Sequence, residues 1–308
     1  MRLLSRLSDA WTVASELRHA LRTPRRVPGI VCVSVGGLRV GGVGKSLVAR
    51  AVAALYADAG VPSAIVLRGY RGSARGPQQV HAYSNPQVVG DEALEHAREG
   101  FTVWVARERV EGVARAREGG AVVAVLDDGF QHHALARDLD LVLVTAADAC
   151  ASTLPAGPLR EPVGALGRAD GVLTLDPEPF RVGALCPTAL GLELRGLRDA
   201  QGALEDVARW RGARVRLVTG IARPERVSGL LARNGLEPCQ HWQYPDHHPI
   251  PTAAWTTPGA DLVLTTAKDA ARSDPWASAE GPPRRTVAVR TTLPGDLSAR
   301  LLGLAPRR

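Results

Sequence analysis

Residues 30–46 constrain this chain more than any other stretch, because they join an apolar run to a glycine-rich loop and then to a helix start. The β-branched residues at 30–35 are typical of a buried parallel strand. The spacing after the loop predicts an amphipathic helix from Lys45 through about Tyr56. A strand, a flexible loop and a helix N-terminus in this order form a phosphate cradle, since backbone N–H groups and the helix dipole both favour an anion.

The residues of this loop have separate chemical roles. Lys45 supplies a compact positive charge, and Ser46 supplies a hydroxyl that can bind Mg²⁺. The usual pattern has a glycine five residues before Gly44, but Arg39 stands there, so Gly41 and Gly42 are expected to provide the backbone flexibility. A glycine-rich turn with a chance lysine is the alternative interpretation. The predicted nucleotide-binding residues are Gly41, Gly42, Val43, Gly44, Lys45 and Ser46.

Lysine usage favours the nucleotide site over the chance turn. The chain has 38 lysine and arginine residues, of which only Lys45 and Lys268 are lysines. A sequence that uses arginine almost everywhere keeps lysine in the loop, where a point-charge ammonium fits and a broad planar guanidinium does not.

Composition limits the remaining possibilities. A length of 308 residues suggests about two domains, and 45% hydrophobic with 22% charged residues is ordinary for a globular protein. The four scattered cysteines indicate reduced thiols without a disulfide framework or a zinc site. An aromatic content of 4% argues against a base-stacking nucleic-acid surface, whereas a net charge of +7 indicates an anionic partner. No feature indicates an obligate protein partner, a signal peptide or a membrane-spanning run.

Residues 1–26 form a basic N-terminal segment with helical periodicity. Its apolar residues recur every three or four positions and are surrounded by arginines; they are Leu3, Leu7, Trp11, Ala14, Leu17 and Leu21. A basic amphipathic helix of this kind can lie on an anionic membrane surface. Packing of the helix on the protein's own surface is the alternative.

Alternating strands and helices define the expected fold. Residues 27–182 predict an α/β domain of the P-loop type with a doubly wound, mostly parallel sheet. The pattern weakens over residues 183–214, which are expected to be a linker. Residues 215–308 then predict a second, smaller α/β domain.

Three further segments carry candidate chemistry. Asp127 and Asp128 follow an apolar strand at 121–126, where a carboxylate next to a phosphate loop can hold Mg²⁺. Two acids on a solvated turn, or zinc at His132 and His133, are the alternatives. Asp91 opens a helix after a glycine and could serve only as a cap. Residues 244–249 form a polar loop that is either half of a metal site or a surface turn.

Together these segments resemble one family, the tetraacyldisaccharide 4′-kinases, which phosphorylate the lipid A precursor. The resemblance extends from about Pro28 to Lys268 and rests on ordered motifs at 35–46, 68–70, 89–92, 126–133, 154–162, 220–226, 246–248 and 265–270. It implies two α/β/α domains, ATP-dependent phosphorylation of the 4′-hydroxyl of an acylated glucosamine disaccharide, and a peripheral location at the cytoplasmic face of the bacterial inner membrane.

The resemblance also assigns roles to residues. It implies that Lys45 and Ser46 bind ATP phosphates and Mg²⁺, and that Asp128, Gln131 and Glu161 belong to the magnesium site. It further implies that Asp91 and His247 form a catalytic base dyad. Two other function classes remain as alternatives: a different P-loop enzyme acting on a soluble substrate, such as a small-molecule ligase or a metallochaperone GTPase, and a non-enzymatic nucleotide-regulated binding protein.

Overall fold

A computed structural model describes residues 2–246 and 248–306. The chain divides into two compact units. The first comprises Met1–Gly191 and Thr292–Arg308, and the second comprises Leu192–Thr291.

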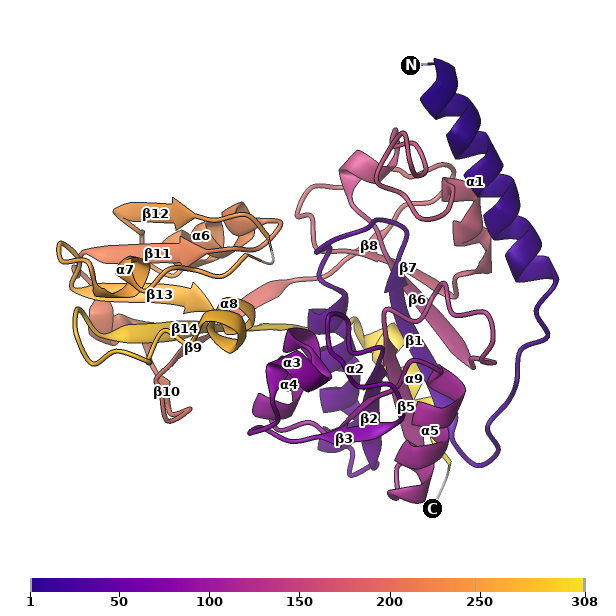
Figure 1. The fold of residues 1–308 in the computed structure, drawn as a ribbon, viewed down its shortest axis with the longest axis horizontal. Helices are drawn as coiled ribbons and strands as arrows, with labels where there is room; N and C mark the ends of the chain where they lie inside the picture. The colour runs from indigo at the N-terminus through magenta and orange to yellow at the C-terminus, as the bar shows by residue number, and fades with distance from the viewer. Residues whose placement is uncertain (1, 247, 307–308) are drawn as a thin grey trace. The chain divides into compact units, whose positions relative to one another are not determined.

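The first unit is built on a mostly parallel eight-stranded sheet (Figure 1). Its strand order is β3 (Gln78–Val80), β4 (Val103–Val105), β2 (Ser63–Leu67), β5 (Val123–Asp127), β1 (Val31–Gly37), β6 (Leu139–Leu143), β7 (Gly171–Thr174) and β8 (Thr188–Ala189). Among the described strands of this sheet, β3 pairs antiparallel with β4 and the other neighbours pair in parallel. The α-helices of this unit are α1 (Arg2–Ala20), α2 (Lys45–Asp58), α3 (Pro86–Val89), α4 (Asp91–Arg98), α5 (Arg109–Glu118) and α9 (Gly295–Leu304). The predicted α/β fold class is confirmed.

The central strands bring the loop between β1 and α2 to one edge of the sheet. Every residue of β5 and β6 is buried, as expected for parallel strands covered on both faces. In the register of β1 and β5, Val35 lies opposite Asp127. The loops that follow these two strands therefore begin at the same edge of the sheet, which is where ligands bind in open α/β folds.

Close packing at this edge leaves no room for a side chain at Gly36. A Cβ atom there would lie 2.3 Å from Cβ and 2.9 Å from the backbone nitrogen of Phe130. We expect Gly36→Ala to destabilise the protein by about 1–3 kcal/mol and to lower the thermal midpoint by about 2–10 °C. The control is Gly76→Ala, because nothing lies within 4 Å of a Cβ at that position. Equal midpoints for the two variants in thermal unfolding would contradict this packing.

The second unit has its own six-stranded sheet. The strand order is β10 (Leu204–Glu205), β9 (Leu192–Arg198), β14 (Arg284–Thr291), β13 (Leu262–Thr266), β11 (Val215–Thr219) and β12 (Gln240–Gln243). The central strands pair in parallel, and β9 pairs antiparallel with both β14 and β10. Its helices are α6 (Pro224–Arg233), α7 (Ala253–Thr256) and α8 (Ala267–Ser273). The core includes Leu217, Leu231 and Leu264, which have no exposed surface.

Two of the expected boundaries differ from the structure. Residues 183–214 form β8, β9 and β10 instead of a linker. Charged residues alternate with the apolar residues of β9, so the sequence shows no continuous apolar run there. The pairing of β9 with β14 also joins segments that are far apart in the sequence. Residues 292–308 do not continue the second domain, because α9 packs in the first unit. There the Tyr56 hydroxyl donates to the Leu301 carbonyl at 2.7 Å, and Arg300 pairs with Asp170 at 2.6 Å.

Candidate active site

Residues 38–44, which we call the phosphate loop, lead from β1 into α2. Two glycines of this loop have backbone dihedral angles in the left-handed region. Gly41 and Gly44 both have φ 104°, and Gly44 is the N-cap of α2. Gly42 is not among the positive-φ glycines of the described residues, so its expected contribution to the flexibility of the loop stays a prediction. The left-handed turn falls at Gly44 because the chain must enter the helix there, at the residue just before Lys45.

The first half of the phosphate loop pairs with residues 153–161, which we call the 153–161 loop. The Arg160 N–H donates to the Leu38 carbonyl at 2.7 Å, and the Val40 N–H donates to the Pro158 carbonyl at 2.9 Å. Arg39 forms a bridge with Leu159 between these bonds, and its guanidinium lies 2.6 Å from Asp148. This pairing holds position 39 in extended backbone, so the fold does not need a glycine there.

Lys45 and Asp128 lie together beside the loop. The Lys45 ammonium is 3.4 Å from the Gly41 carbonyl and 3.3 Å from Oδ1 of Asp128. Oδ2 of Asp128 accepts a hydrogen bond from Arg160 at 2.7 Å. Burial alone would raise the pKa of Asp128, but the nearby charges of Lys45 and Arg160 lower it below its usual value. The site therefore contains an ionised carboxylate at neutral pH.

Gln131 and Glu161 extend this network. Nε2 of Gln131 donates to the Gly37 carbonyl at 3.1 Å and to Glu161 at 3.3 Å. Glu161 is almost fully buried and accepts two hydrogen bonds from Arg168, at 2.9 and 3.1 Å. Burial would raise the pKa of Glu161, but a hydrogen bond from His133 and the Arg168 charge lower it. Arg160 contacts both Asp128 and Gln131, so the predicted magnesium-site residues adjoin one another.

His96 has a role beside the site that no sequence motif predicted. This histidine is fully buried on α4, and its Nε2 lies 2.9 Å from Oδ2 of Asp127. Burial acts to raise the pKa of Asp127, but hydrogen bonds from His96 and Ser46 lower it below its usual value. Arg50 of α2 also pairs with Glu95 of α4 at 2.8 Å. These contacts tie α4 to the phosphate-loop helix; the signal that could have shown this is a histidine on the apolar face of a predicted helix.

Asp91 begins α4, and backbone packing positions it. The N-cap is Gly90, with φ 87°, so Asp91 is not the capping residue that the alternative required. A Cβ at Gly90 would lie 2.6 Å from the Tyr70 carbonyl, and one at Gly72 would lie 2.4 Å from the Val88 carbonyl. The motifs at 68–70 and 89–92 thus pack directly against each other. His247, its predicted partner, lies outside the described residues.

The donor set suits Mg²⁺, which prefers oxygen ligands. Oδ1 of Asp128 is buried 3.3 Å from the Lys45 ammonium and has no further hydrogen-bond partner within the described part of the chain, so a cation bound there would share this oxygen with Lys45. The two histidines of the alternative zinc site have separate surroundings: His133 contacts His19 and Glu161, whereas Nε2 of His132 is buried and has no hydrogen-bond partner among the described residues. No cluster of three or more His, Cys, Asp and Glu side chains suited to a metal occurs in residues 2–246 and 248–306.

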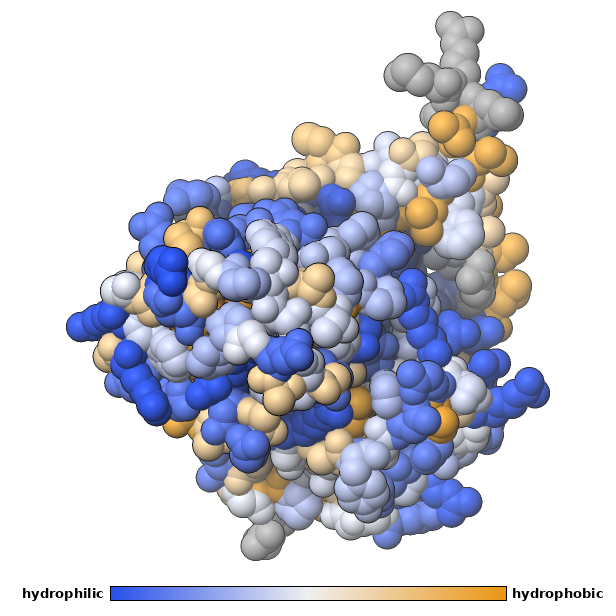
Figure 2. Space-filling model, turned by 60° about the vertical axis from the view of Figure 1, so that its left-hand side comes forward, coloured by the Kyte–Doolittle hydropathy of each residue, from blue (hydrophilic) through white to orange (hydrophobic). Residues whose placement is uncertain are grey.

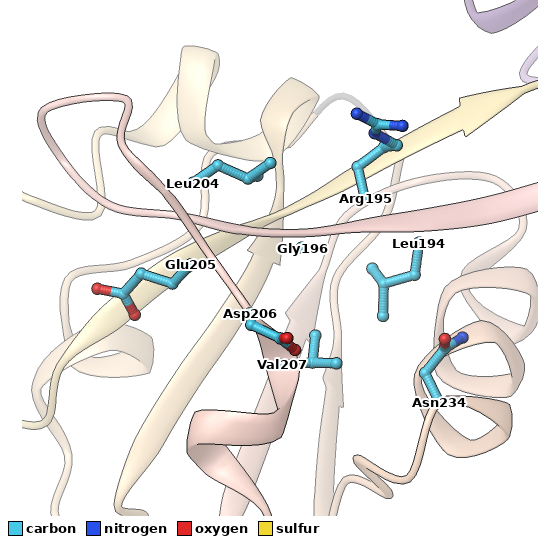
Figure 3. A pocket seen from close by; sticks show the side chains of 8 residues that line it. All are labelled: Leu194, Arg195, Gly196, Leu204, Glu205, Asp206, Val207 and Asn234. Carbon is cyan, nitrogen blue, oxygen red and sulfur yellow. The ribbon is translucent and has the colours of Figure 1, made fainter.

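A cavity of about 440 Å³ lies in the second unit, against β9 and β10 (Figure 3). Its polar groups do not converge, because the side chains of Arg195 and Glu205 point away from each other. Glu205 is also engaged by Arg285 at 2.8 Å and by Trp210 at 3.2 Å. None of the predicted site residues lines this cavity. The phosphate loop of the first unit is therefore the better candidate site.

Comparisons with known proteins agree with this geometry. The family profile described as LpxK, Tetraacyldisaccharide-1-P 4'-kinase, matches residues 1–305. The Tetraacyldisaccharide 4'-kinase of Dinoroseobacter shibae is 38% identical over 272 residues, covering 84% of this chain and 80% of that protein. The enzyme of the same name from Paramagnetospirillum magneticum is 37% identical over 308 residues, covering 96% and 86%.

A solved structure matches the whole chain. It is LpxK from Aquifex aeolicus in complex with ATP, with a TM-score of 0.82, 26% sequence identity and coverage of 99% of both chains. Together with the profile match and the curated relatives, this shows that the chain belongs to the tetraacyldisaccharide 4′-kinase family.

Proposed function

We propose that this chain transfers the γ-phosphate of ATP to the 4′-hydroxyl of a tetraacylated glucosamine disaccharide 1-phosphate, a step in lipid A biosynthesis. The observation that carries the proposal is the grouping of Lys45, Asp128 and Gln131 beside a phosphate loop, in a chain that matches this kinase family along its length. The ATP complex of the structurally similar LpxK supports ATP as the phosphate donor.

The first unit supplies the groups that bind the nucleotide. The N–H groups at the start of α2 would bind the phosphates, and Lys45 would neutralise part of their charge. Ser46, Asp128, Gln131 and Glu161 would hold Mg²⁺, which stabilises the charge that develops on the transferred group. Because Glu161 is already bound by Arg168 and His133, its contribution includes fixing the orientation of Gln131.

The acceptor hydroxyl needs a base, since a sugar alcohol is a poor nucleophile. We assign this role to Asp91 acting with His247, the pair that the family resemblance implies. A carboxylate can orient a histidine and stabilise its charged form while the proton leaves the hydroxyl. The tight packing at Gly90 supports the assignment, because it fixes where α4 begins.

The direct test is to incubate the purified protein with ATP, Mg²⁺ and the disaccharide lipid in mixed micelles. We expect a phosphorylated lipid by mass spectrometry and ATP consumption that depends on the acylated acceptor. ATP turnover without that dependence would favour a different P-loop enzyme. Bound ATP with no transfer to the lipid would favour a nucleotide-regulated binding protein.

We also propose that α1 lies on the anionic inner face of the bacterial inner membrane, where ATP is available. Apolar side chains of α1 are exposed, including Leu4, Leu7, Trp11 and Leu17. Figure 2 shows exposed hydrophobic side chains in orange along the upper right side of the molecule. A helix that packed its apolar stripe on the protein would bury them instead. No helix in the described part of the chain has the length and apolar content that a bilayer crossing requires.

Replacing Leu4, Leu7 and Leu17 together with glutamine should weaken binding to anionic vesicles by about 100-fold. Each leucine is about half exposed, so its insertion contributes about 1 kcal/mol. Leu185→Gln is the control, because Leu185 is 40% exposed but lies outside α1. Vesicle co-sedimentation measures the effect, and equal binding by the triple variant and the wild type would exclude α1 as the membrane contact.

A further inference from the structure

The polar side of α1 packs on the protein. Four polar residues, spaced three or four positions apart, form what we call the inner face of α1: Ser8, Thr12, Ser15 and His19. The Ser8 hydroxyl donates to the Thr153 carbonyl at 2.8 Å and accepts from the Ala156 N–H at 3.1 Å. Oγ1 of Thr12 lies 3.1 Å from Oγ1 of Thr153. The N-terminal half of α1 is thus fixed to the start of the 153–161 loop.

The C-terminal half of the inner face reaches the residues around Glu161. The Ser15 hydroxyl donates to Oε1 of Glu161 at 3.4 Å. Nδ1 of His19 and Nδ1 of His133 are 3.0 Å apart, with one ring donating to the other. Nε2 of His133 lies in turn 3.4 Å from Oε1 of Glu161. α1 therefore contacts the Glu161 carboxylate, whose side chain is 3% exposed, both directly through Ser15 and indirectly through His19 and His133.

The 153–161 loop contacts both α1 and the phosphate loop. Its backbone pairs with residues 38–40 of the phosphate loop. Glu161 accepts a hydrogen bond from Gln131, and Arg160 donates one to Asp128. The Trp11 indole also donates to the Arg160 carbonyl at 2.8 Å. A shift of α1 would therefore move the supports of Asp128 and Gln131 together.

We propose that Ser15 and His19 are positioning residues for phosphoryl transfer, acting through Glu161 and His133 to hold Gln131 and the 153–161 loop against the phosphate loop. This inference rests on the proposed kinase function. It gives α1 a second role beside membrane contact, because the contacts to the site and the exposed apolar side chains are on the same helix. Outer contacts that orient metal-site residues commonly change affinity or activity by 10–100-fold when removed.

The test compares a Ser15→Ala/His19→Ala double variant with the wild type. We expect kcat to fall and the Mg²⁺ concentration for half-maximal activity to rise, each by about 10-fold or more, with KM for the lipid and binding to anionic vesicles unchanged. His19→Asn should recover most of the activity that His19→Ala loses, because the asparagine amide occupies nearly the position of Nδ1. Glu16→Ala, an exposed substitution on the same helix, is the control.

Calorimetric binding of a non-hydrolysable ATP analogue with Mg²⁺ provides a readout that needs no lipid substrate. The double variant should bind the analogue about 10-fold more weakly than the wild type or Glu16→Ala. If the wild type does not phosphorylate the lipid, the proposed function fails, while this measurement still decides the positioning role. Wild-type analogue binding in the double variant would overturn the inference. So would a loss of activity matched by an equal loss of vesicle binding, or no recovery with His19→Asn.

Discussion

Lys45→Ala is expected to lower kcat/KM for ATP by about 10²–10³, the usual cost of removing one donor to developing charge. The ammonium lies 3.3 Å from Asp128 and folds back to the Gly41 carbonyl. Without it, the phosphates lose a positive charge and lie beside an aspartate whose ion pair with Arg160 remains. The kcat/KM of Lys45→Arg should exceed that of Lys45→Ala by less than tenfold, because a planar guanidinium does not fit the space that a compact ammonium occupies.

Steady-state kinetics on the lipid acceptor measure this effect. Arg115→Ala is the control, because it removes a cation from an exposed pair with Glu118 on α5 and should retain wild-type rates. A Lys45→Ala/Asp128→Asn double variant should lose less than the product of the two single losses, since the side chains are in contact. Wild-type turnover by Lys45→Ala would refute the phosphate-loop assignment.

The fold was predictable where the sequence pattern is local. Continuous apolar runs predicted strands at 30–35 and 121–126, and the structure has β1 and β5 there with ends shifted by one or two residues. Strand β9 could not be found in this way, because its pairing with β14 and β10 identifies it as part of a sheet. The placement of α9 depends on contacts with Tyr56 and Asp170, far from it in sequence.

The same distinction applies to the site. The neighbourhood of Lys45 and Asp128 follows from two sequence motifs and the rule that the carboxyl ends of parallel strands share one edge of the sheet. No sequence motif predicts the contact of His96 with Asp127, because it depends on the packing of α4 against β5. The periodicity of residues 1–26 indicated an amphipathic helix but not that its polar side packs on the protein. That side fits a loop about 145 residues away in sequence.

Asp91→Asn is the second change with a large expected effect, a fall in kcat of about 10²–10⁴ with little change in KM for ATP. Asparagine keeps the size of the side chain and the start of α4 but cannot stabilise a protonated histidine. Loss of a first-turn acid also costs the helix about 0.3–1 kcal/mol. Glu111→Gln in the first turn of α5 controls for that cost and should retain wild-type kcat.

His247→Ala should lower kcat by a similar factor of about 10²–10⁴, because the proposed base dyad then lacks its imidazole. If Asp91 and His247 act as a unit, the double variant loses little more than the worse single variant. Rapid-quench measurement of a single turnover isolates the chemical step from product release, so the comparison concerns proton removal itself. Losses that multiply fully in the double variant would mean that the two residues act independently, and the base would then have to be assigned to one of them alone.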